Sequence, residues 1–278
     1  LKLNSFYKLE QKILLYNSLM IIKWAGSKKW LFKRHPQLFP TKYNTYFEPF
    51  LGGGSIFFSL RPKKSVISDI NDHLISCYKE LKENPVKLYK GVKELIDNHN
   101  EDNYYDLRDE FNKSHRPDLF LYLNRTCYNG IYRENKSGGF NVPVGRRKSS
   151  FLPFQEHDFE YFSEILANAN IKKQDFMDTL NLVTENDFIY VDPPYIKEKS
   201  FREYGSNVFS PEDLKELAAK LNLLSKKNKI LFSNFNLSNV RDLFDGNQWK
   251  FKEVEQTTNI SGKNSGRKKM KEILIYNY

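Results

Sequence analysis

The sequence predicts an α/β fold, in which one mostly parallel sheet is interrupted by a helical insertion. Three segments indicate this fold. Residues 45–50 form an apolar run that leads into three consecutive glycines and a helix-like segment, residues 56–60. Residues 65–68 are typical of a second strand, and residues 188–191 of a buried strand that two prolines end at once. A strand, a glycine turn and a helix form the first half of a nucleotide-binding βαβ unit.

Further along the chain, the pattern continues to favour this fold. Residues 74–113 and 118–124 show helical spacing of apolar residues, and Ser210 and Pro211 begin a helix that we expect to end near residue 225. Strands are predicted at residues 170–174, 229–234, 251–257 and 272–278, with a short helix at 237–244. We therefore expect a sheet domain formed by residues 20–73 and 160–278, and an insertion formed by residues 74–159.

Composition limits the class of protein. The chain has 278 residues, 40% of them hydrophobic, and a net charge of +10, which fits a folded protein with a polyanionic partner. Its two cysteines, Cys77 and Cys127, imply no disulfide scaffold and favour a reducing cytoplasm. No run of apolar residues reaches the length of a membrane span, and the histidines lack metal-site spacing. Residues 1–19 are interpreted as an N-terminal extension without assigned function. We expect no metal, no membrane contact and a monomer.

Polar or glycine residues follow the predicted parallel strands at the point where each strand ends. They are Gly52 to Gly54, Asp69, Asp175 and Asp192. The carboxyl ends of parallel strands share one edge of a sheet, and open α/β sheets bind ligands there. Contiguous glycines without a following Gly-Lys-Ser/Thr do not indicate a phosphate loop. Together with an acidic strand end, which typically binds a ribose diol, they indicate a nucleoside ligand.

The tetrapeptide Asp192-Pro193-Pro194-Tyr195 is the most informative motif. The prolines stiffen the turn and lack N–H groups, so carbonyl oxygens are presented beside a carboxylate and a ring. A carboxylate and a carbonyl can accept both protons of an exocyclic amine, while the ring stacks on the flat molecule that bears it. An ordinary strand end with a proline turn is the alternative.

Residues 125–148 form a long segment rich in Asn, Gly, Arg and Tyr. Such loops carry function more often than structure, although a solvated surface loop is the alternative. Arg can bind the edge of guanine with two hydrogen bonds, Asn can pair with adenine, and Tyr or Ile can insert between bases. The candidate DNA-binding residues of this segment are Tyr128, Asn129, Ile131, Arg133, Asn141, Pro143, Arg146 and Lys148.

These motifs, in this order, resemble those of the Dam-type DNA adenine-N6 methyltransferases from about residue 21 to the C-terminus. The family pattern Lys-Trp-Ala-Gly-x-Lys is matched by residues 23–28, with Ser27 in place of the commoner Gly. Residues 47–54 resemble the cofactor loop of the family, residues 192–195 its catalytic motif, and residues 128–143 its DNA-reading loop. The family has a Rossmann-like methyltransferase sheet with a helical target-recognition insertion, and uses S-adenosylmethionine to methylate double-stranded DNA.

The resemblance implies roles for individual residues. Asp192, Pro193, Pro194 and Tyr195 would be catalytic, and the cofactor would contact Trp24, Lys28, Gly52, Gly53, Gly54, Asp69, Asp175, Phe176 and Asp192. For Trp24 and Lys28 the resemblance is the only support. The function implied is methylation of N6 of a flipped adenine in a short, GATC-like site. Restriction–modification, a phage function and repair all stay open as the biological role.

Other functions share these features. A cytosine-N4 methyltransferase would use a similar motif, but Asp at position 192, where Ser would favour cytosine, favours adenine. The Arg- and Asn-rich loop argues against a protein substrate, and RNA stays an alternative. A DNA-binding regulator without methyl transfer would lack some of the expected side chains, and all of them are present. No segment outside the matched region suggests a fused nuclease.

Overall fold

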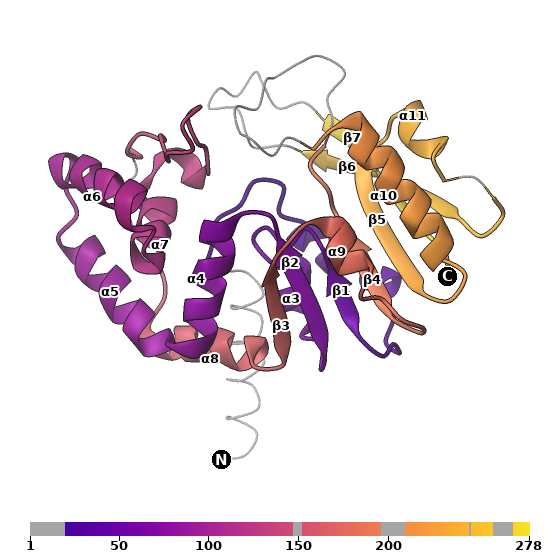
Figure 1. The fold of residues 1–278 in the computed structure, drawn as a ribbon, viewed down its shortest axis with the longest axis horizontal. Helices are drawn as coiled ribbons and strands as arrows, with labels where there is room; N and C mark the ends of the chain where they lie inside the picture. Colours follow the sequence, from indigo (N-terminus) through magenta and orange to yellow (C-terminus); the bar gives the residue numbers. More distant parts are fainter. Residues whose placement is uncertain (1–19, 147–151, 196–208, 245, 258–268) are drawn as a thin grey trace.

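The structure, a computed structural model, describes residues 20–146, 152–195, 209–244, 246–257 and 269–278. In these ranges seven strands form one sheet in the order β3-β2-β1-β4-β5-β7-β6 (Figure 1). The first five strands in that order are parallel, and β7 is antiparallel to both of its neighbours. The strands are β1 (Tyr46–Glu48), β2 (Ser65–Asp69), β3 (Ala169–Lys173), β4 (Phe188–Val191), β5 (Lys229–Phe235), β6 (Lys250–Thr257) and β7 (Lys269–Tyr276). The predicted α/β, Rossmann-like fold is confirmed.

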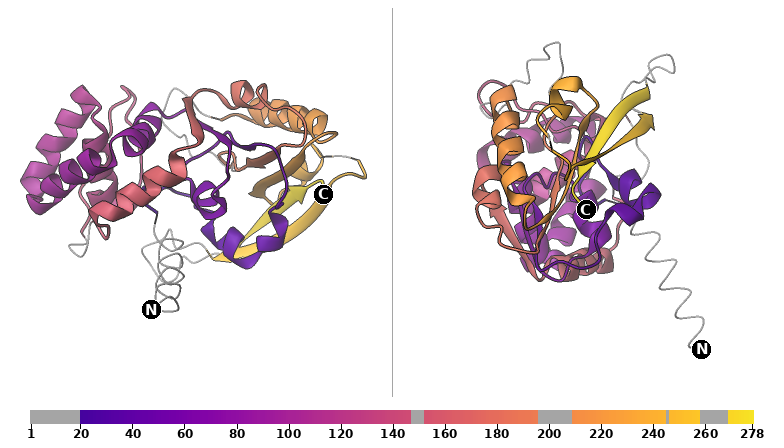
Figure 2. Two further views of the ribbon diagram at one scale, coloured as in Figure 1. Left: turned by 90° about the horizontal axis from the view of Figure 1, so that it is seen from below. Right: turned by 90° about the vertical axis from the view of Figure 1, so that its right-hand side faces the viewer.

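Helices cover both faces of the sheet (Figure 2). On one face α9 (Phe176–Leu180), α10 (Pro211–Leu224) and α11 (Ser238–Arg241) bury the side chains of Ile189, Ile230 and Ile273. On the other face α2 (Lys29–Arg34), the 3-10 helix η1 (Pro36–Leu38), α3 (Ser55–Leu60) and α4 (Asp72–Glu83) pack in a second core with Tyr46, Tyr190 and Leu274. Alternate residues of each central strand therefore enter different cores, as the pleat of a strand requires.

The predicted insertion, residues 74–159, contains most of α4, then α5 (Pro85–Asp97), α6 (Glu101–Ser114), α7 (Pro117–Thr126) and the 3-10 helix η2 (Tyr128–Gly130), and the first residues of α8 (Glu156–Leu166). The helical pattern of residues 74–113 is divided among α4, α5 and α6. Asn84 has the non-helical angles φ −135° and ψ 56°, and Pro85 begins the next helix. Asn100 begins α6 by accepting a hydrogen bond from the N–H of Asn103.

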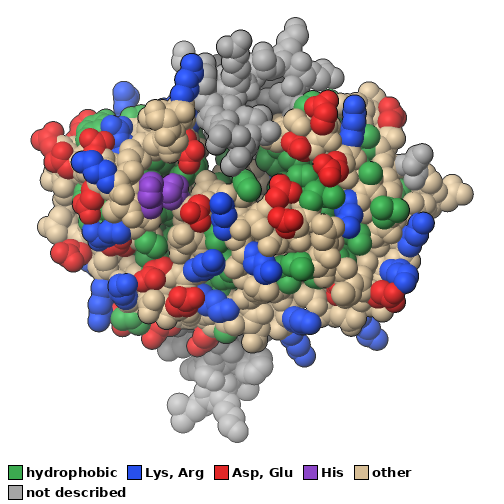
Figure 3. All heavy atoms as spheres, viewed as in Figure 1, with side chains coloured by type: hydrophobic (Ala, Val, Ile, Leu, Met, Phe, Trp, Pro, Cys, Tyr) green, Lys and Arg blue, Asp and Glu red, His purple; other side chains and the backbone are tan. Residues whose placement is uncertain are grey.

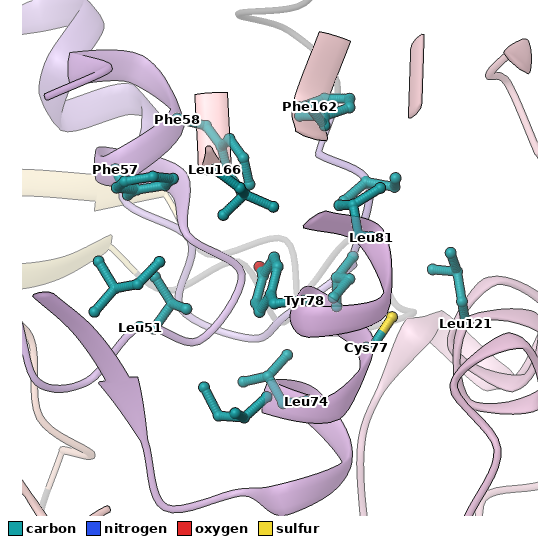
Figure 4. Close-up of a cluster of buried hydrophobic side chains, with 14 of the residues drawn as sticks. Leu51, Phe57, Phe58, Leu74, Cys77, Tyr78, Leu81, Leu121, Phe162 and Leu166 are labelled. Atoms are coloured by element: carbon teal, nitrogen blue, oxygen red, sulfur yellow. The ribbon is translucent and has the colours of Figure 1, made fainter. Parts of the chain in front are cut away.

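Helix α4 joins the insertion to the sheet. Its buried side chains Leu74, Cys77, Tyr78 and Leu81 lie among residues of α3, α7 and α8 (Figure 4). The predicted domain boundaries, after residues 73 and 159, fall at the start of α4 and inside α8. The division into two domains stays a prediction, because both helices pack in one continuous core.

The strand order places a ligand crevice at one edge of the sheet. The chain moves from β1 to β2 and β3 on one side, and then crosses to β4 and β5 on the other side. The connections that leave β1 and β4 therefore diverge, and the crevice opens beyond the carboxyl ends of these two strands. The glycine loop follows β1, and Asp192 follows β4.

Candidate active site

A cavity of about 780 Å³ occupies this crevice. It is lined by segments that lie far apart in the sequence, namely residues 24–28, 48–53, 69–71, 174–176 and 192–195, together with Ser55, Tyr190, Phe209, Asp213 and Phe235. Every predicted catalytic or cofactor-binding residue lies in its wall except Gly54. Gly54 instead forms the N-cap of α3, in the left-handed conformation. The folded chain thus gathers the strand ends that the sequence predicted to converge.

The glycine loop is shaped by Trp24. A Cβ atom on Gly52 would lie 2.8 Å from Cδ1 of Trp24, and one on Gly53 would lie 3.1 Å from its Cβ. Gly52 also has φ +48°, a conformation that side chains other than glycine rarely adopt. Trp24, for which the sequence offered no physical reason, therefore packs directly on the loop and forms one wall of the cavity.

Asp69 holds the other side of the same loop. Its Oδ2 accepts a hydrogen bond from the N–H of Gly52 at 2.9 Å, and its Oδ1 accepts one from the N–H of Asn71 at 3.0 Å. Burial raises the pKa of Asp69, and these N–H donors oppose the rise. The hydroxyl of Tyr78 donates to the carbonyl of Gly52 at 3.1 Å. Each carboxylate oxygen keeps a second lone pair, so Asp69 can also accept a hydrogen bond from a diol.

Asp192 is anchored through both carboxylate oxygens. The buried ammonium of Lys28 lies 3.0 Å from Oδ2 of Asp192 and also donates to the carbonyl of Gly26 at 3.0 Å. The hydroxyl of Ser233 donates to Oδ1 at 2.7 Å. No local sequence pattern predicts either contact. Charge-assisted bonds of this kind are short and strong, and here they fix the orientation of the carboxylate.

Tyr195 is oriented by aromatic and polar neighbours. Its ring meets that of Phe235 edge to face, with 4.4 Å between centroids, and the Lys28 ammonium lies 4.6 Å from its centre. Its hydroxyl donates to Oε2 of Glu272 at 3.4 Å. Burial raises the pKa of Tyr195 well above its usual range, and burial also raises the pKa of Glu272. Tyr195 therefore acts as a neutral aromatic surface, not as a base.

A slot of aromatic rings lies at the β3 side of the cavity. Phe176 stacks on Phe50 with 5.4 Å between centroids, and Phe209 meets both rings at an angle. Oδ1 of Asp175 accepts a hydrogen bond from the N–H of Met177 at 2.8 Å and so begins α9, while the residue stays exposed. Apolar rings beside an exposed carboxylate suit a flat heterocycle with an amino group.

Sequence reasoning missed Glu48, Phe50, Ser233, Phe235 and Glu272 as site residues. Side chains alternate along a strand, so Glu48 lies on the same face of the sheet as Tyr46, and Ser233 on the same face as Tyr190. No sequence pattern indicates that this face lines a site. Burial raises the pKa of Glu48 well above its usual range, and the Tyr46 hydroxyl donates to it at 2.7 Å. Glu48 therefore adds a buried carboxyl group, held by the Tyr46 hydroxyl, to the cavity wall.

The segment predicted to read DNA is an ordered ladder in residues 127–146. Cys127 pairs with Val144 and Glu134 with Phe140, and the Tyr104 hydroxyl of α6 donates to the carbonyl of Val142 at 2.8 Å. Of the predicted DNA-binding residues in this ladder, Asn141 is partly buried and the others are exposed: Tyr128, Asn129, Ile131, Arg133, Pro143 and Arg146. Lys148 lies outside the described residues. The structure thus presents these side chains on a supported surface.

The ladder of residues 127–146, which the sequence predicts to read DNA, contacts the wall of the cavity. The ring of Tyr132 stacks on Trp24 with 5.6 Å between centroids. The side chain of Asn124 accepts from the N–H of Lys23 at 2.8 Å and donates to its carbonyl at 2.7 Å. The segment that carries Trp24 and Lys28 is therefore fastened to the insertion.

The part of the chain that forms this site matches a known protein family. A family model for D12 class N6 adenine-specific DNA methyltransferases matches residues 24–260. The chain belongs to this family. Residues 24–260 include the whole described cavity, so its members' methyl donor, S-adenosylmethionine, is the donor that the family implies here. The family also places the chain with enzymes that methylate adenine and not cytosine.

Relatives agree with the family over almost the full length. The chain is 36% identical to the Type II methyltransferase M1.LlaDCHI of Lactococcus lactis subsp. cremoris, over 92% of this chain and 94% of the relative. It is 35% identical to the Type II methyltransferase M.MjaIII of Methanocaldococcus jannaschii, over 92% and 98%. It is 34% identical to the DNA adenine methylase of Haemophilus influenzae, over 91% of each chain.

Two further observations concern partners. Among the described residues, no group of three or more His, Cys, Asp or Glu side chains is arranged to hold a metal ion. Within the same residues, no helix is both long and apolar enough to cross a membrane.

Ser233 provides a test of the anchored carboxylate. Ser233→Ala removes a hydrogen bond to a charged group, which is worth about 1.5–3 kcal/mol. We expect kcat for methylation to fall by about 10- to 100-fold, with the KM for S-adenosylmethionine unchanged, because Asp192 loses its orientation and not its charge. Ser233→Thr keeps the hydroxyl and should restore most of the rate. Equal losses in the Ala and Thr variants would mean that Ser233 only fills space.

Proposed function

We propose that the chain transfers a methyl group from S-adenosylmethionine to N6 of an adenine that is flipped out of duplex DNA, within a short, GATC-like site. One observation carries this proposal. The anchored carboxylate of Asp192 and the ring of Tyr195 line the same cavity as the glycine loop, Asp69 and the aromatic slot. A reacting amine and a nucleoside cofactor would therefore meet in one enclosed space.

The residues present fit the cofactor. Phe176 and Phe50 would hold its adenine, with Asp175 near the amino group, and Asp69 would accept a hydrogen bond from its ribose. Trp24, Lys28 and the glycines Gly52 and Gly53 would line its methionine part, and Gly54 would shape the loop. When bound, S-adenosylmethionine supplies an electrophilic methyl group on a sulfonium ion.

The target adenine would be activated by hydrogen bonds. Its N6 lone pair is delocalised into the ring, which makes the amine a poor nucleophile. Asp192 and the carbonyl of Pro193 would each accept a hydrogen bond from the amino group and so favour a tetrahedral nitrogen, while Tyr195 stacks on the base and Pro194 keeps the turn rigid. Holding the reactants in line can lower a barrier by about 7–11 kcal/mol in favourable cases. Preorganised donors, here the Lys28 and Ser233 that hold Asp192, add to this.

The insertion, residues 74–159, would be the target-recognition domain, and residues 20–73 and 160–278 the catalytic domain. Tyr128 and Ile131 are 45% and 36% exposed, which suits insertion into the gap that a flipped base leaves. Arg133, Asn141 and Pro143 would contact bases, and Asn129, Arg146 and Lys148 the DNA around them. We also propose that the enzyme acts in the cytoplasm as a monomer.

Arg133 and Asn141 are expected to act as a pair. Nε of Arg133 donates to Oδ1 of Asn141 at 2.7 Å, and Nη2 donates to its carbonyl at 3.2 Å. Arg133→Ala should relax specificity at one base pair by about 1–3 kcal/mol. Asn141→Ala should lower specificity at the same base pair by less, because the guanidinium can still donate to the backbone carbonyl of residue 141. Methylation rates on a set of single-substitution duplexes measure both effects.

A control variant makes this comparison decisive. Lys136→Ala removes an exposed charge of the same ladder, and should weaken DNA binding evenly for all sequences. Arg133 and Asn141 do not read one base pair together if Arg133→Ala also weakens DNA binding equally for all sequences. The same conclusion follows if Arg133→Ala and Asn141→Ala lower specificity at different base pairs.

The proposed function is tested by sequencing DNA from cells that express the chain in a host without adenine methylation. We expect N6-methyladenine at one short sequence, and none when the Asp192→Asn variant is expressed. N4-methylcytosine, or modification of RNA alone, would contradict the proposal. The names of the relatives support either a restriction–modification role, as for a Type II methyltransferase, or the role of a DNA adenine methylase. The recovered site and its frequency in the source genome would separate the two.

A further inference from the structure

A second cavity, of about 930 Å³, lies at the opposite edge of the sheet. It is formed by the segments that precede β1, β2, β4 and β5 and by the residue Asn277, and we call it the rear groove. Figure 1 shows the segments before β1, β4 and β5 together at the lower right. Strand β5 runs from Lys229 in the rear groove to Phe235 in the active-site cavity, about 20 Å for seven residues. The two cavities are therefore separate.

Positive charge dominates the rear groove. Seven lining residues are cations: Lys42, Arg61, Lys63, Lys64, Lys226, Lys227 and Lys229. The other lining residues are uncharged, so no Asp or Glu contributes to its described wall. Asn44, Asn186, Asn228 and Asn277 add amide groups among the cations. The amides of Asn44, Asn228 and Asn277 donate to backbone carbonyls and shape the groove, and the Lys and Arg side chains are the groups that proteins use to bind phosphate oxygens.

Most of the rear-groove lysines have no counter-ion among the residues that the structure describes. Lys227 pairs with Glu185, and Lys229 donates to the carbonyl of Lys42 at 3.1 Å. Among the described residues, Lys42, Lys63, Lys64 and Lys226 form no ion pair within 4.0 Å.

On the face shown in Figure 3, Lys and Arg side chains are interspersed with those of Asp and Glu, and several pair with them. Arg116, for example, pairs with both Glu110 and Asp118, and Arg241 pairs with Glu253. Like charges that line one hollow repel one another, so an external polyanion would be bound favourably there.

We propose that the rear groove binds the phosphate backbone of a second stretch of DNA while the first stretch occupies the active site. This inference rests on duplex DNA being the substrate. A short duplex in the active site cannot reach the opposite edge of the sheet, since strong bending over about 20–30 bp costs several kcal/mol. Only a long duplex that loops back, or a second molecule, contacts both sites. The rear groove would hold the enzyme on long DNA between methylation events.

The test compares two variants with the same change in net charge. The groove variant is Lys63→Glu/Lys64→Glu/Lys226→Glu, and the control variant is Lys79→Glu/Lys90→Glu/Lys215→Glu, which changes exposed lysines of α4, α5 and α10. Affinity is measured between about 50 and 200 mM salt for a long duplex, about 500 bp without a target site, and methylation is measured on a short duplex of about 20 bp that contains one.

We expect the groove variant to lose at least about tenfold in affinity for the long duplex. Its slope of log K against log salt should fall by about 3, because each lost phosphate contact contributes about 0.9. The control variant should lose much less, and both should methylate the short duplex within about twofold of the natural rate. Equal losses in both variants would mean that net charge alone acts, and would overturn the proposal. Failure of the unaltered chain to methylate the short duplex would instead contradict the proposed function.

A second measurement identifies the source of the phosphate. Lysine acetylation, read by mass spectrometry, reports which amines a ligand covers. Long DNA should protect Lys63, Lys64 and Lys226, whereas one equivalent of the short cognate duplex should not. Protection by inorganic tripolyphosphate but not by long DNA would assign the groove to a free phosphate compound, and the DNA proposal would be wrong. Absence of protection by either probe would also overturn it.

Discussion

Asp192→Asn should lower kcat by about 10³-fold while DNA binding is kept. Asn preserves the size of the side chain and an oxygen that can accept from Ser233, but it removes the negative charge that would accept a proton of the target amine. Loss of a positioned proton acceptor costs about 10²- to 10⁴-fold. The segment proposed to read DNA, residues 127–146, packs on α6 and α7 and not on β4, so the affinity for cognate duplex should be nearly unchanged. Single-turnover methylation and equilibrium binding measure the two quantities.

The same variant should also lose stability, because the Lys28 side chain is 3% exposed and would lose the carboxylate that lies 3.0 Å from its ammonium. Removing one member of a buried ion pair costs about 3–5 kcal/mol. Urea unfolding of Lys28→Met/Asp192→Asn separates stability from chemistry. This double variant should recover much of the free energy of unfolding, since no buried charge is left unpaired, and it should stay inactive. Turnover near the natural rate in Asp192→Asn would remove Asp192 from the catalytic role.

The ends of the parallel strands were predictable for a geometric reason. A strand is short, its alternation is local, and every parallel strand ends at the same edge of the sheet. Gly52, Asp69, Asp175 and Asp192 could therefore be assigned to one cavity before any contact was known, and the structure places all four in its wall.

Contacts between distant segments were not predictable. Lys28 and Ser233 bind the same carboxylate although they lie far from residue 192 in the sequence, and neither has a local pattern that marks its partner. A Lys beside a Trp or a Ser inside an apolar strand is common in proteins without a site. Only the register of β4 with β5, which pairs Val191 with Phe232, brings Ser233 beside Asp192.

The ordered pairing within residues 127–146 was also not predictable, although these residues lie close together in the sequence. Its composition indicated function, but Gly, Asn and Arg gave no strand period from which pairing could be inferred. Order there depends on α6 and α7. Asn112 binds the N–H of Phe140 at 2.8 Å and its carbonyl at 3.2 Å, and Gly145 approaches the carbonyl of Cys127 too closely for any Cβ. The loop is ordered by the helices beneath it.

Gly52→Ala should weaken binding of S-adenosylmethionine by at least about 30-fold. Two costs combine at this position. An L residue at φ +48° costs about 1–2 kcal/mol, and a Cβ 2.8 Å from Cδ1 of Trp24 adds overpacking of about 1–3 kcal/mol. The loop can escape both costs only by moving away from Trp24, and this breaks the 2.9 Å bond from its N–H to Asp69. Isothermal titration of the purified chain measures the affinity.

Two other glycines separate these causes. Gly138 has φ +81° and open space around its Cβ position, so Gly138→Ala carries the conformational cost alone and should leave cofactor affinity unchanged. Gly53 has no positive φ but would place its Cβ 3.1 Å from that of Trp24, so Gly53→Ala carries the contact alone and should have an intermediate effect. If Gly52→Ala binds S-adenosylmethionine as tightly as Gly138→Ala does, the glycine loop is not part of the cofactor site. The loss of affinity for S-adenosylmethionine should instead increase in the order Gly138→Ala, Gly53→Ala, Gly52→Ala. This order would show that Trp24 and the glycine loop form one rigid wall of the cofactor site.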